Sequence, residues 1–248
     1  MTELTHSELS NTEAAVRRAV AYTFLAHCFA YPDESAVAAM QEAAQAATPF
    51  VAGTPLAGLM ALASTARSKE IEADHVRLFT LSSSPDCPSF ESAFFSGDPI
   101  QQTNRMADIA GFYRAFGVDA GAPGFRPDDI CVELEFMGYL CRKQVYAAEH
   151  LGAPRVGQTL RAQRMFLEEH LGQWAGALGG RIAVRADHEF YREAGTALAH
   201  WISEDCQLLR AFPPQVATAP SPDWASAELA DVPETDRPLI GFDDIAVM

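Results

Sequence analysis

The chain has 248 residues, of which 48% are hydrophobic and 21% charged, and its formal net charge is −15. This length suits one large domain or two small ones with a substantial core, and the composition is ordinary for a globular protein. The acidic balance argues against nucleic acid and against an anionic membrane surface as partners, because both require a basic face.

Helical periodicity dominates the first third of the chain. Ser10 and Glu13 form a capping box ahead of the first apolar-periodic segment, which Pro32 ends. Pro55 takes the first position of a later helix, where its missing N–H costs nothing. The helices expected here cover residues 14–31, 33–47, 56–67 and 69–79.

Residues 80–98 interrupt this rhythm with a long connection that has no periodicity. Connections longer than about 12–15 residues are uncommon within a compact domain and are often functional. The three phenylalanines of this one predict that it packs against the body of the protein. Beyond it, helices are expected over 106–116, from Ile130 to Val145, over 156–171, and over 188–209 with Asp187 as the cap.

The predicted fold is all-α, a single domain of about eight to ten helices over residues 1–212. Residues 213–248 are Pro-rich and acidic, and we expect a tail that is partly docked or mobile. The N-terminus lacks the basic and apolar regions of a secretory signal. Five cysteines without a CxxC pair fit reduced thiols, so the expected location is cytoplasmic, without membrane insertion.

The sequence motifs give little support for a metal site or a catalytic nucleophile. A di-iron bundle needs two Glu-x-x-His pairs, and Glu72 with His75 is the only match within a predicted helix. Cys87 lies in the long connection without a recognisable base. We therefore expect neither a catalytic residue nor a metal site, although a helical enzyme or redox carrier that uses the Glu72/His75 pair or a bound haem stays open as a rival.

The segment RPDDICVELEFM, residues 126–137, combines acidic residues with an apolar stripe at the start of a helix. Asp129 and Glu133 are four residues apart, where like charges repel by roughly 0.2–0.5 kcal/mol. One interpretation is an N-cap with a solvated first turn, because carboxylates stabilise the positive end of a helix dipole. The other is a receptor for a ligand that carries arginines beside apolar residues, since a guanidinium binds a carboxylate through two hydrogen bonds.

Six segments in order resemble the TorD/DmsD/NarJ-type maturation chaperones of molybdenum-containing oxidoreductases. They are DHVRLF (74–79), CPSFES (87–92), FYRAFG (112–117), PDDICVELEFM (127–137), FLEEHLGQW (166–174) and FYREAGTALAHW (190–201). The CPSFES form and the acidic tail are most similar to the chaperones of dimethylsulfide- and ethylbenzene-dehydrogenase-like enzymes. The family usually has Asp-His where this sequence has Asp128-Asp129, so its peptide preference is expected to differ.

The resemblance implies a non-catalytic cytoplasmic chaperone, a monomer or homodimer. It would bind the catalytic subunit of a molybdopterin oxidoreductase, through a twin-arginine leader peptide, and assist cofactor insertion before export. No cofactor would be held permanently, although transient contact with the client's molybdopterin is expected. The alternative is a stable small subunit of the same oxidoreductase.

Carried over residue by residue, the resemblance also assigns a site. Partner contact falls on the helix at Asp128, Asp129, Glu133 and Phe136, and in the connection at Phe90, Glu91 and Ser92. Asp74, Arg77, Phe79 and Pro88 would brace this site, with Asp74 and Arg77 paired and the helix held against the long connection. For Arg77 and Glu91, a buried structural ion pair is an equally good interpretation.

Overall fold

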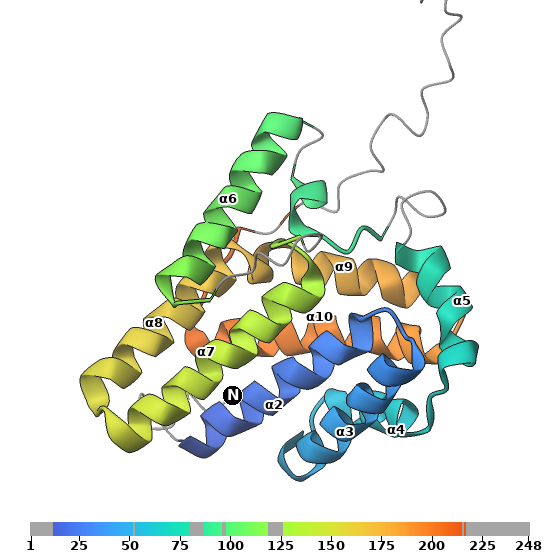
Figure 1. Ribbon diagram of the computed structural model, residues 1–248, viewed down its shortest axis with the longest axis horizontal. Helices are drawn as coiled ribbons and strands as arrows, with labels where there is room; N and C mark the ends of the chain where they lie inside the picture. Colours follow the sequence, from blue (N-terminus) through green and yellow to red (C-terminus); the bar gives the residue numbers. More distant parts are fainter. Residues whose placement is uncertain are drawn as a thin grey trace, which may run out of the picture.

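The computed structural model describes residues 12–51, 53–79, 87–95, 98–118, 126–214 and 216. These residues form nine α-helices and one short 3-10 helix, with no strand among them (Figure 1). The helices are α2 (Thr12–Phe29), α3 (Glu34–Val51), α4 (Leu56–Thr65), α5 (Ser68–Phe79), η1 (Glu91–Phe94), α6 (Pro99–Ala115), α7 (Ile130–His150), α8 (Ala153–Glu169), α9 (Leu171–Arg185) and α10 (Glu189–Leu209). The all-α prediction is confirmed.

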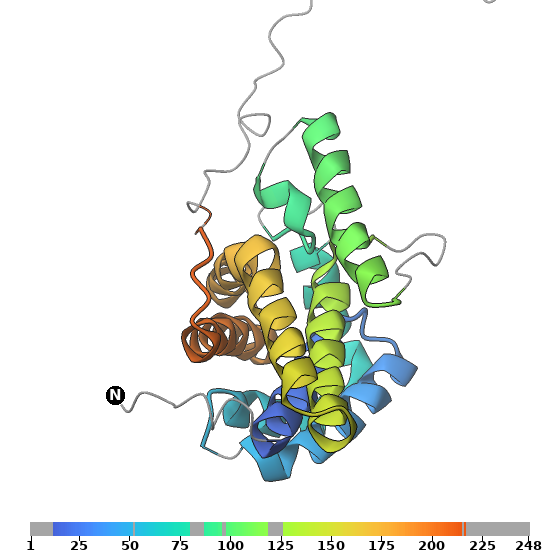
Figure 2. The ribbon, with the colours of Figure 1, turned by 90° about the vertical axis from the view of Figure 1, so that its left-hand side faces the viewer.

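The helices pack in neighbouring pairs around one core. Helix α2 lies along α7 on one side and α3 on the other, while α8 packs on α7 and α9 on α10 (Figure 1). Helix α6 and η1 stand together at one end of the molecule (Figure 2). This arrangement places the beginning of α7 next to η1, and the candidate site lies there.

Helix α9 was not among the helices expected from the sequence. Its segment contains four glycines, each of which lowers helix stability by about 1 kcal/mol relative to alanine. The helix forms because Trp174, Leu178 and Ile182, four residues apart, lie on one face and are completely buried. Tertiary packing therefore outweighs the weak local propensity.

Two glycines allow α9 and α10 to approach closely. A Cβ atom added at Gly179 would lie 2.5 Å from the carbonyl oxygen of Gly195, and one added at Gly195 would lie 2.5 Å from the carbonyl oxygen of Gly179. No side chain fits at these distances, so the backbones of the two helices cross in direct contact.

A buried ion pair ties the first described helix to the last. Arg18 on α2 and Asp205 on α10 are 2% and 3% exposed, and the Arg18 Nη2 atom donates to the Asp205 carboxylate at 2.8 Å. Tyr22 donates to the same carboxylate, and Arg18 also donates to Gln163 on α8. Because both charges have several partners, the burial of this pair is tolerated.

Several helix boundaries differ from the expected ones. Helix α3 continues past residue 47 to Val51, and α6 begins at Pro99, where the Asp98 side chain accepts a hydrogen bond from the Ile100 backbone N–H. The cap of α10 is His188, not Asp187. Ser10 and almost all of the proposed 213–248 tail lie outside the described residues, so the proposed capping box and the domain division stay predictions.

Within the part of the chain that the structure describes, no helix has the length and apolar character needed to cross a membrane.

Candidate functional site

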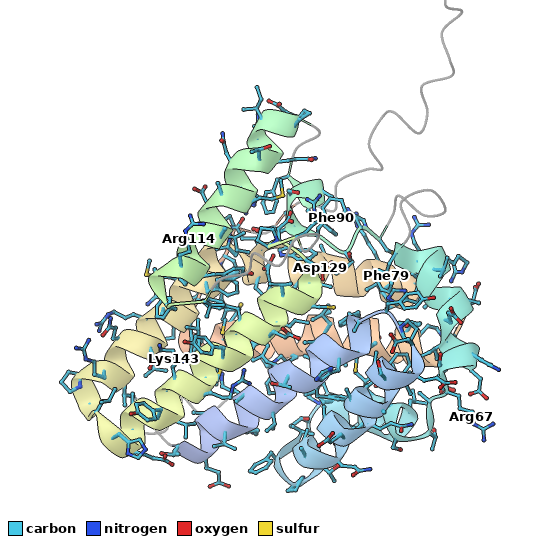
Figure 3. The ribbon with its side chains drawn as sticks, in the orientation of Figure 1. Arg67, Phe79, Phe90, Arg114, Asp129 and Lys143 are labelled. Atoms are coloured by element: carbon cyan, nitrogen blue, oxygen red, sulfur yellow. The ribbon has the colours of Figure 1, made fainter. Side chains whose placement is uncertain are left out.

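Two segments about forty residues apart in the sequence meet at the start of α7. The backbone N–H of Ile130 donates to the carbonyl oxygen of Ser89 at 2.8 Å, and that of Glu91 donates to the carbonyl of Asp128 at 2.8 Å. These bonds form an isolated antiparallel bridge between Phe90 and Asp129, which lie close together in Figure 3. The described part of the long connection thus packs on the body as predicted.

Asp129 caps α7. One carboxylate oxygen accepts from the backbone N–H of Cys131 at 2.9 Å, and the other accepts from the Ser89 hydroxyl at 2.9 Å. Burial raises the pKa of Asp129 above its ordinary value of 3.8, while these hydrogen bonds oppose the rise. The N-cap interpretation of the sequence is confirmed at this position, and the side chain stays partly exposed.

Asp128 is fully buried beneath the connection. Arg126 binds it through Nε at 3.0 Å and Nη2 at 3.1 Å, and the backbone N–H of Ser92 donates to it at 3.1 Å. The Arg126 guanidinium lies over the Phe90 ring, 4.0 Å from its centroid. Asp128 therefore fixes the Glu91–Ser92 end of the 89–92 segment from inside the protein, while Asp129 and Ile130 hold the Ser89 end.

Glu91 is also completely buried, and it joins three elements. The Nε atom of Arg105, on α6, donates to it at 2.8 Å, and the His170 Nδ1 atom lies 3.2 Å from its carboxylate. Arg105 continues to the Gln173 side chain on α9 at 2.7 Å. The structural ion-pair interpretation of Glu91 is confirmed, and its partner is Arg105.

Glu133 differs from Glu91 and Asp128 because it forms no ion pair with any described residue. Its Oε2 atom accepts from the Trp174 indole N–H at 3.2 Å, and its Oε1 atom has no hydrogen-bond partner among the described residues. Burial, followed by repulsion from Glu91, raises the pKa of Glu133 well above its ordinary value of 4.5. The carboxyl group is therefore protonated more readily than an exposed glutamic acid.

The sequence predicted two exposed carboxylates, Asp129 and Glu133, beside an exposed apolar surface. This prediction is wrong for Glu133 and for the apolar residue Phe136. Glu133 is 0% exposed and Phe136 only 3%, the latter in an aromatic cluster with Tyr113 and Phe166. Neither side chain is accessible to another protein in this conformation. Asp129 is the acidic residue of the helix start that stays accessible.

Glu91, Asp128, Asp129 and Glu133 are referred to below as the carboxylate cluster. The sequence did not indicate four of their partners, namely Arg105, Arg126, His170 and Trp174. Arg126 carries a local signal, because it lies two residues before Asp128. The others come from distant segments, and nothing in their sequence neighbourhood pairs them with the cluster.

Asp74 and Arg77 form the expected ion pair, which also contacts another part of the fold. Asp74 accepts from the backbone N–H of Asp187 at 3.1 Å and of His188 at 2.9 Å. Arg77 donates to the carbonyl oxygen of Arg185 at 2.7 Å. Their described contacts hold the turn between α9 and α10. Residues 80–86 of the long connection lie outside the described residues, so the expectation that Asp74 and Arg77 brace it stays a prediction.

Phe79 likewise packs on the helical body. Its ring centroid lies 6.3 Å from that of Phe29 and 5.9 Å from that of Tyr191. Pro88, in the connection itself, is buried. The described residues include no group of three or more His, Cys, Asp or Glu side chains placed to hold a metal ion.

Comparison with known proteins gives the family. The family model described as nitrate reductase delta subunit matches residues 23–178, which is more than half of the chain. The chain belongs to the nitrate reductase delta subunit family. This match confirms the family resemblance drawn from the sequence motifs, and its range contains the whole carboxylate cluster.

The chain is also similar to two individual proteins. A protein named perchlorate reductase assembly chaperone, from Dechloromonas aromatica (strain RCB), is 34% identical over 122 residues. These residues are 48% of this chain and 54% of that protein, so the match spans about half of the relative. A solved redox enzyme maturation protein from Archaeoglobus fulgidus is 22% identical, with a TM-score of 0.42, over 60% of this chain and 93% of that one.

Proposed function

We propose that this protein is a cytoplasmic chaperone for the assembly of a molybdopterin-containing oxidoreductase. The supporting observation is the family match over residues 23–178, together with a relative that carries the name of an assembly chaperone. The mechanism is differential binding without catalysis. The chaperone binds the unfinished catalytic subunit tightly and releases it once folding around the cofactor buries the recognised surface, because a ligand favours the state that it binds better.

The charge balance of the carboxylate cluster suggests where an arginine of a client leader binds. Two of its carboxylates have arginine partners, Arg105 on Glu91 and Arg126 on Asp128. Of the other two, Glu133 is completely buried, and Asp129 is the partly exposed carboxylate without a cationic partner among the described residues. An arginine of the leader supplies the missing positive charge.

The surroundings of Asp129 suit such a guest. Phe90, across the bridge, is only partly buried and already holds one guanidinium, that of Arg126, against its ring. A guanidinium binds a carboxylate and stacks on an aromatic face at the same time. Cys131 and Val132, also partly exposed, offer apolar contact to the residues that follow the arginine. In this proposal Asp128, Glu91 and Ser92 shape the site from beneath.

Asp129→Asn tests the leader site. Asparagine caps a helix as well as aspartate does, so the fold is retained while the charge is lost. A hydrogen bond to a charged group contributes about 1.5–3 kcal/mol, so we expect a roughly 10- to 150-fold weaker affinity for a synthetic peptide with two adjacent arginines and an apolar run. The readout is isothermal titration calorimetry.

Glu135→Gln is the matched control, because Glu135 is exposed on the same helix and loses the same charge. Replacing one peptide arginine by glutamine completes a double-mutant cycle. Additive effects of Asp129→Asn and the peptide change would mean that the two groups do not interact, and the leader site would then lie elsewhere.

The client is identified by affinity purification of the tagged full chain from its native host. Recovery of an oxidoreductase precursor with its leader intact supports the chaperone proposal. The family description itself contains the words delta subunit, which favours a second candidate, a stable subunit of the enzyme. Fixed stoichiometry with the mature, cofactor-loaded enzyme would support that candidate. Transient contact with the client's molybdopterin belongs to the first proposal, and no described residue is assigned to it.

A further inference from the structure

A basic pocket lies at the opposite end of α7 from the carboxylate cluster. It has a volume of about 620 Å³ and is bounded by the last turn of α6, the second half of α7 and the first turns of α8. Arg142 and Lys143 of α7 and Arg155 of α8 line it. The chain has a net charge of −15, so a pocket lined by three cations differs in sign from the protein as a whole.

The three cations of the basic pocket have neutral hydrogen-bond partners. Arg142 donates to the Thr23 hydroxyl at 3.0 Å, Lys143 to the Tyr139 hydroxyl at 3.2 Å, and Arg155 to the Gln158 side chain at 2.7 Å. No carboxylate of the described residues forms an ion pair with any of them. The described residues therefore leave the positive charge of this pocket without a counter-ion.

The shape of the basic pocket favours an extended ligand over a small anion. Arg142 reaches toward α2, Lys143 toward Tyr139 and Arg155 along α8, so the three charged groups do not converge on one point. Tyr146 and Leu151 line the same pocket and are 56% and 52% exposed. A polypeptide with several acidic residues and some large apolar ones matches both features.

The chain itself contains such a polypeptide. Residues 217–248 include seven acidic residues and the single basic residue Arg237. The same segment has several large apolar residues, among them Trp224, Leu239, Ile240 and Phe242. We propose that residues 217–248 dock on the basic pocket of the same molecule.

The geometry of the described residues permits this contact. The backbone N–H of Val216 donates to the carbonyl of Gln173 near the start of α9, whereas the pocket lies at the start of α8. At 1.5 Å per residue, the length of α8 puts these points about 25 Å apart. A random coil of 32 residues, the number that follows Val216, would have a root-mean-square span of about 30 Å. When the two lengths match, the effective concentration of a tethered ligand is near its maximum.

Carbodiimide cross-linking of the full chain tests the docking. The chain has two lysines, Lys69 and Lys143, so almost all new amide bonds involve one of two side chains. We expect mass spectrometry to find Lys143 joined to carboxylates of residues 217–248, and Lys69 not joined to them. Lys69 is two residues after Arg67 in the sequence, and Figure 3 shows Arg67 at the other end of the molecule from Lys143.

Charge reversal around the retained lysine is the second part of the experiment. Arg142→Glu with Arg155→Glu leaves Lys143 in place, and we expect it to reduce the Lys143 cross-links at least tenfold. The single variant Arg67→Glu, at an 81% exposed side chain, is the matched control and keeps them. Circular dichroism verifies that each variant is folded.

Two results would overturn the inference. One is a Lys143 cross-link yield to residues 217–248 that is negligible, or equal in the charge-reversed variant. The other is a covalent dimer whose amount falls on dilution, because the acidic segment would then come from a second copy. The docking does not depend on the proposed chaperone function, and the cross-linking experiment needs no client.

Discussion

Glu133→Gln isolates the effect of a buried carboxyl group on stability. The substitution keeps the size of the side chain and an acceptor for the Trp174 indole N–H, but it removes the ability to ionise. Since burial and the nearby Glu91 raise the pKa of Glu133 well above 4.5, the folded protein keeps this carboxyl protonated at pH values where the unfolded chain has lost the proton.

The size of the effect follows from proton linkage. Well above pH 4.5 the unfolded chain binds no proton at residue 133, while the folded chain binds one until the pH approaches its raised pKa. The free energy of unfolding of the wild type therefore falls by about 1.4 kcal/mol per pH unit through this window, relative to a residue that cannot ionise. Below the unfolded pKa both states are protonated and the contribution disappears.

Urea denaturation of wild type and Glu133→Gln, followed by circular dichroism over a series of pH values, measures this difference. We expect the variant to gain stability on the wild type as the pH rises from about 4.5. Glu135→Gln, on the exposed side of the same helix, is expected to follow the wild-type curve. Parallel curves for wild type and Glu133→Gln would refute the reasoning, because they would mean that Glu133 ionises alike in both states.

Two further predictions concern the core. Gly195→Ala places a Cβ atom against the carbonyl oxygen of Gly179, so we expect a loss of about 1–3 kcal/mol in thermal or urea unfolding; Gly180→Ala, which has nothing within 4 Å of an added Cβ, is expected to be neutral or stabilising. Asp205→Asn leaves the buried Arg18 without its counter-ion and is expected to cost about 3–5 kcal/mol, while Glu204→Gln on the exposed face is expected to cost little. A wild-type-like unfolding midpoint for either core variant would contradict the packing described above.

The helical fold was largely readable from the sequence, and the exception is instructive. The apolar stripe of α7 predicted that helix and its capping aspartate correctly. Helix α9 was not predicted because its four glycines lower the local helix propensity. The burial of Trp174, Leu178 and Ile182 against other helices stabilises it. Single-sequence patterns report local preference, whereas α9 owes its existence to distant contacts.

The environment of Glu133 was the main misjudgement at the site. Glu133 lies three residues after Ile130 and four before Met137, which is the spacing of the buried stripe itself. The spacing alone could have indicated burial, but a charged residue is seldom placed in a core without a partner. Its partner, Trp174, belongs to the unrecognised helix. The capping position and partial exposure of Asp129, in contrast, were predictable from its place at the helix start.

The pairing of Arg18 with Asp205 has a consequence for synthesis of the chain. These residues are 187 positions apart, and the arginine lies in the middle of the packed helices. A ribosome that has produced α2 must still translate almost all of α10 before the aspartate exists. Until then the Arg18 guanidinium lacks its native counter-ion and is better solvated by water than buried, so α2 cannot assume its final packing early. Completion of the core is thereby coupled to translation of the last described helix, and a nascent chain interrupted before Asp205 retains an uncompensated charge where the core should close.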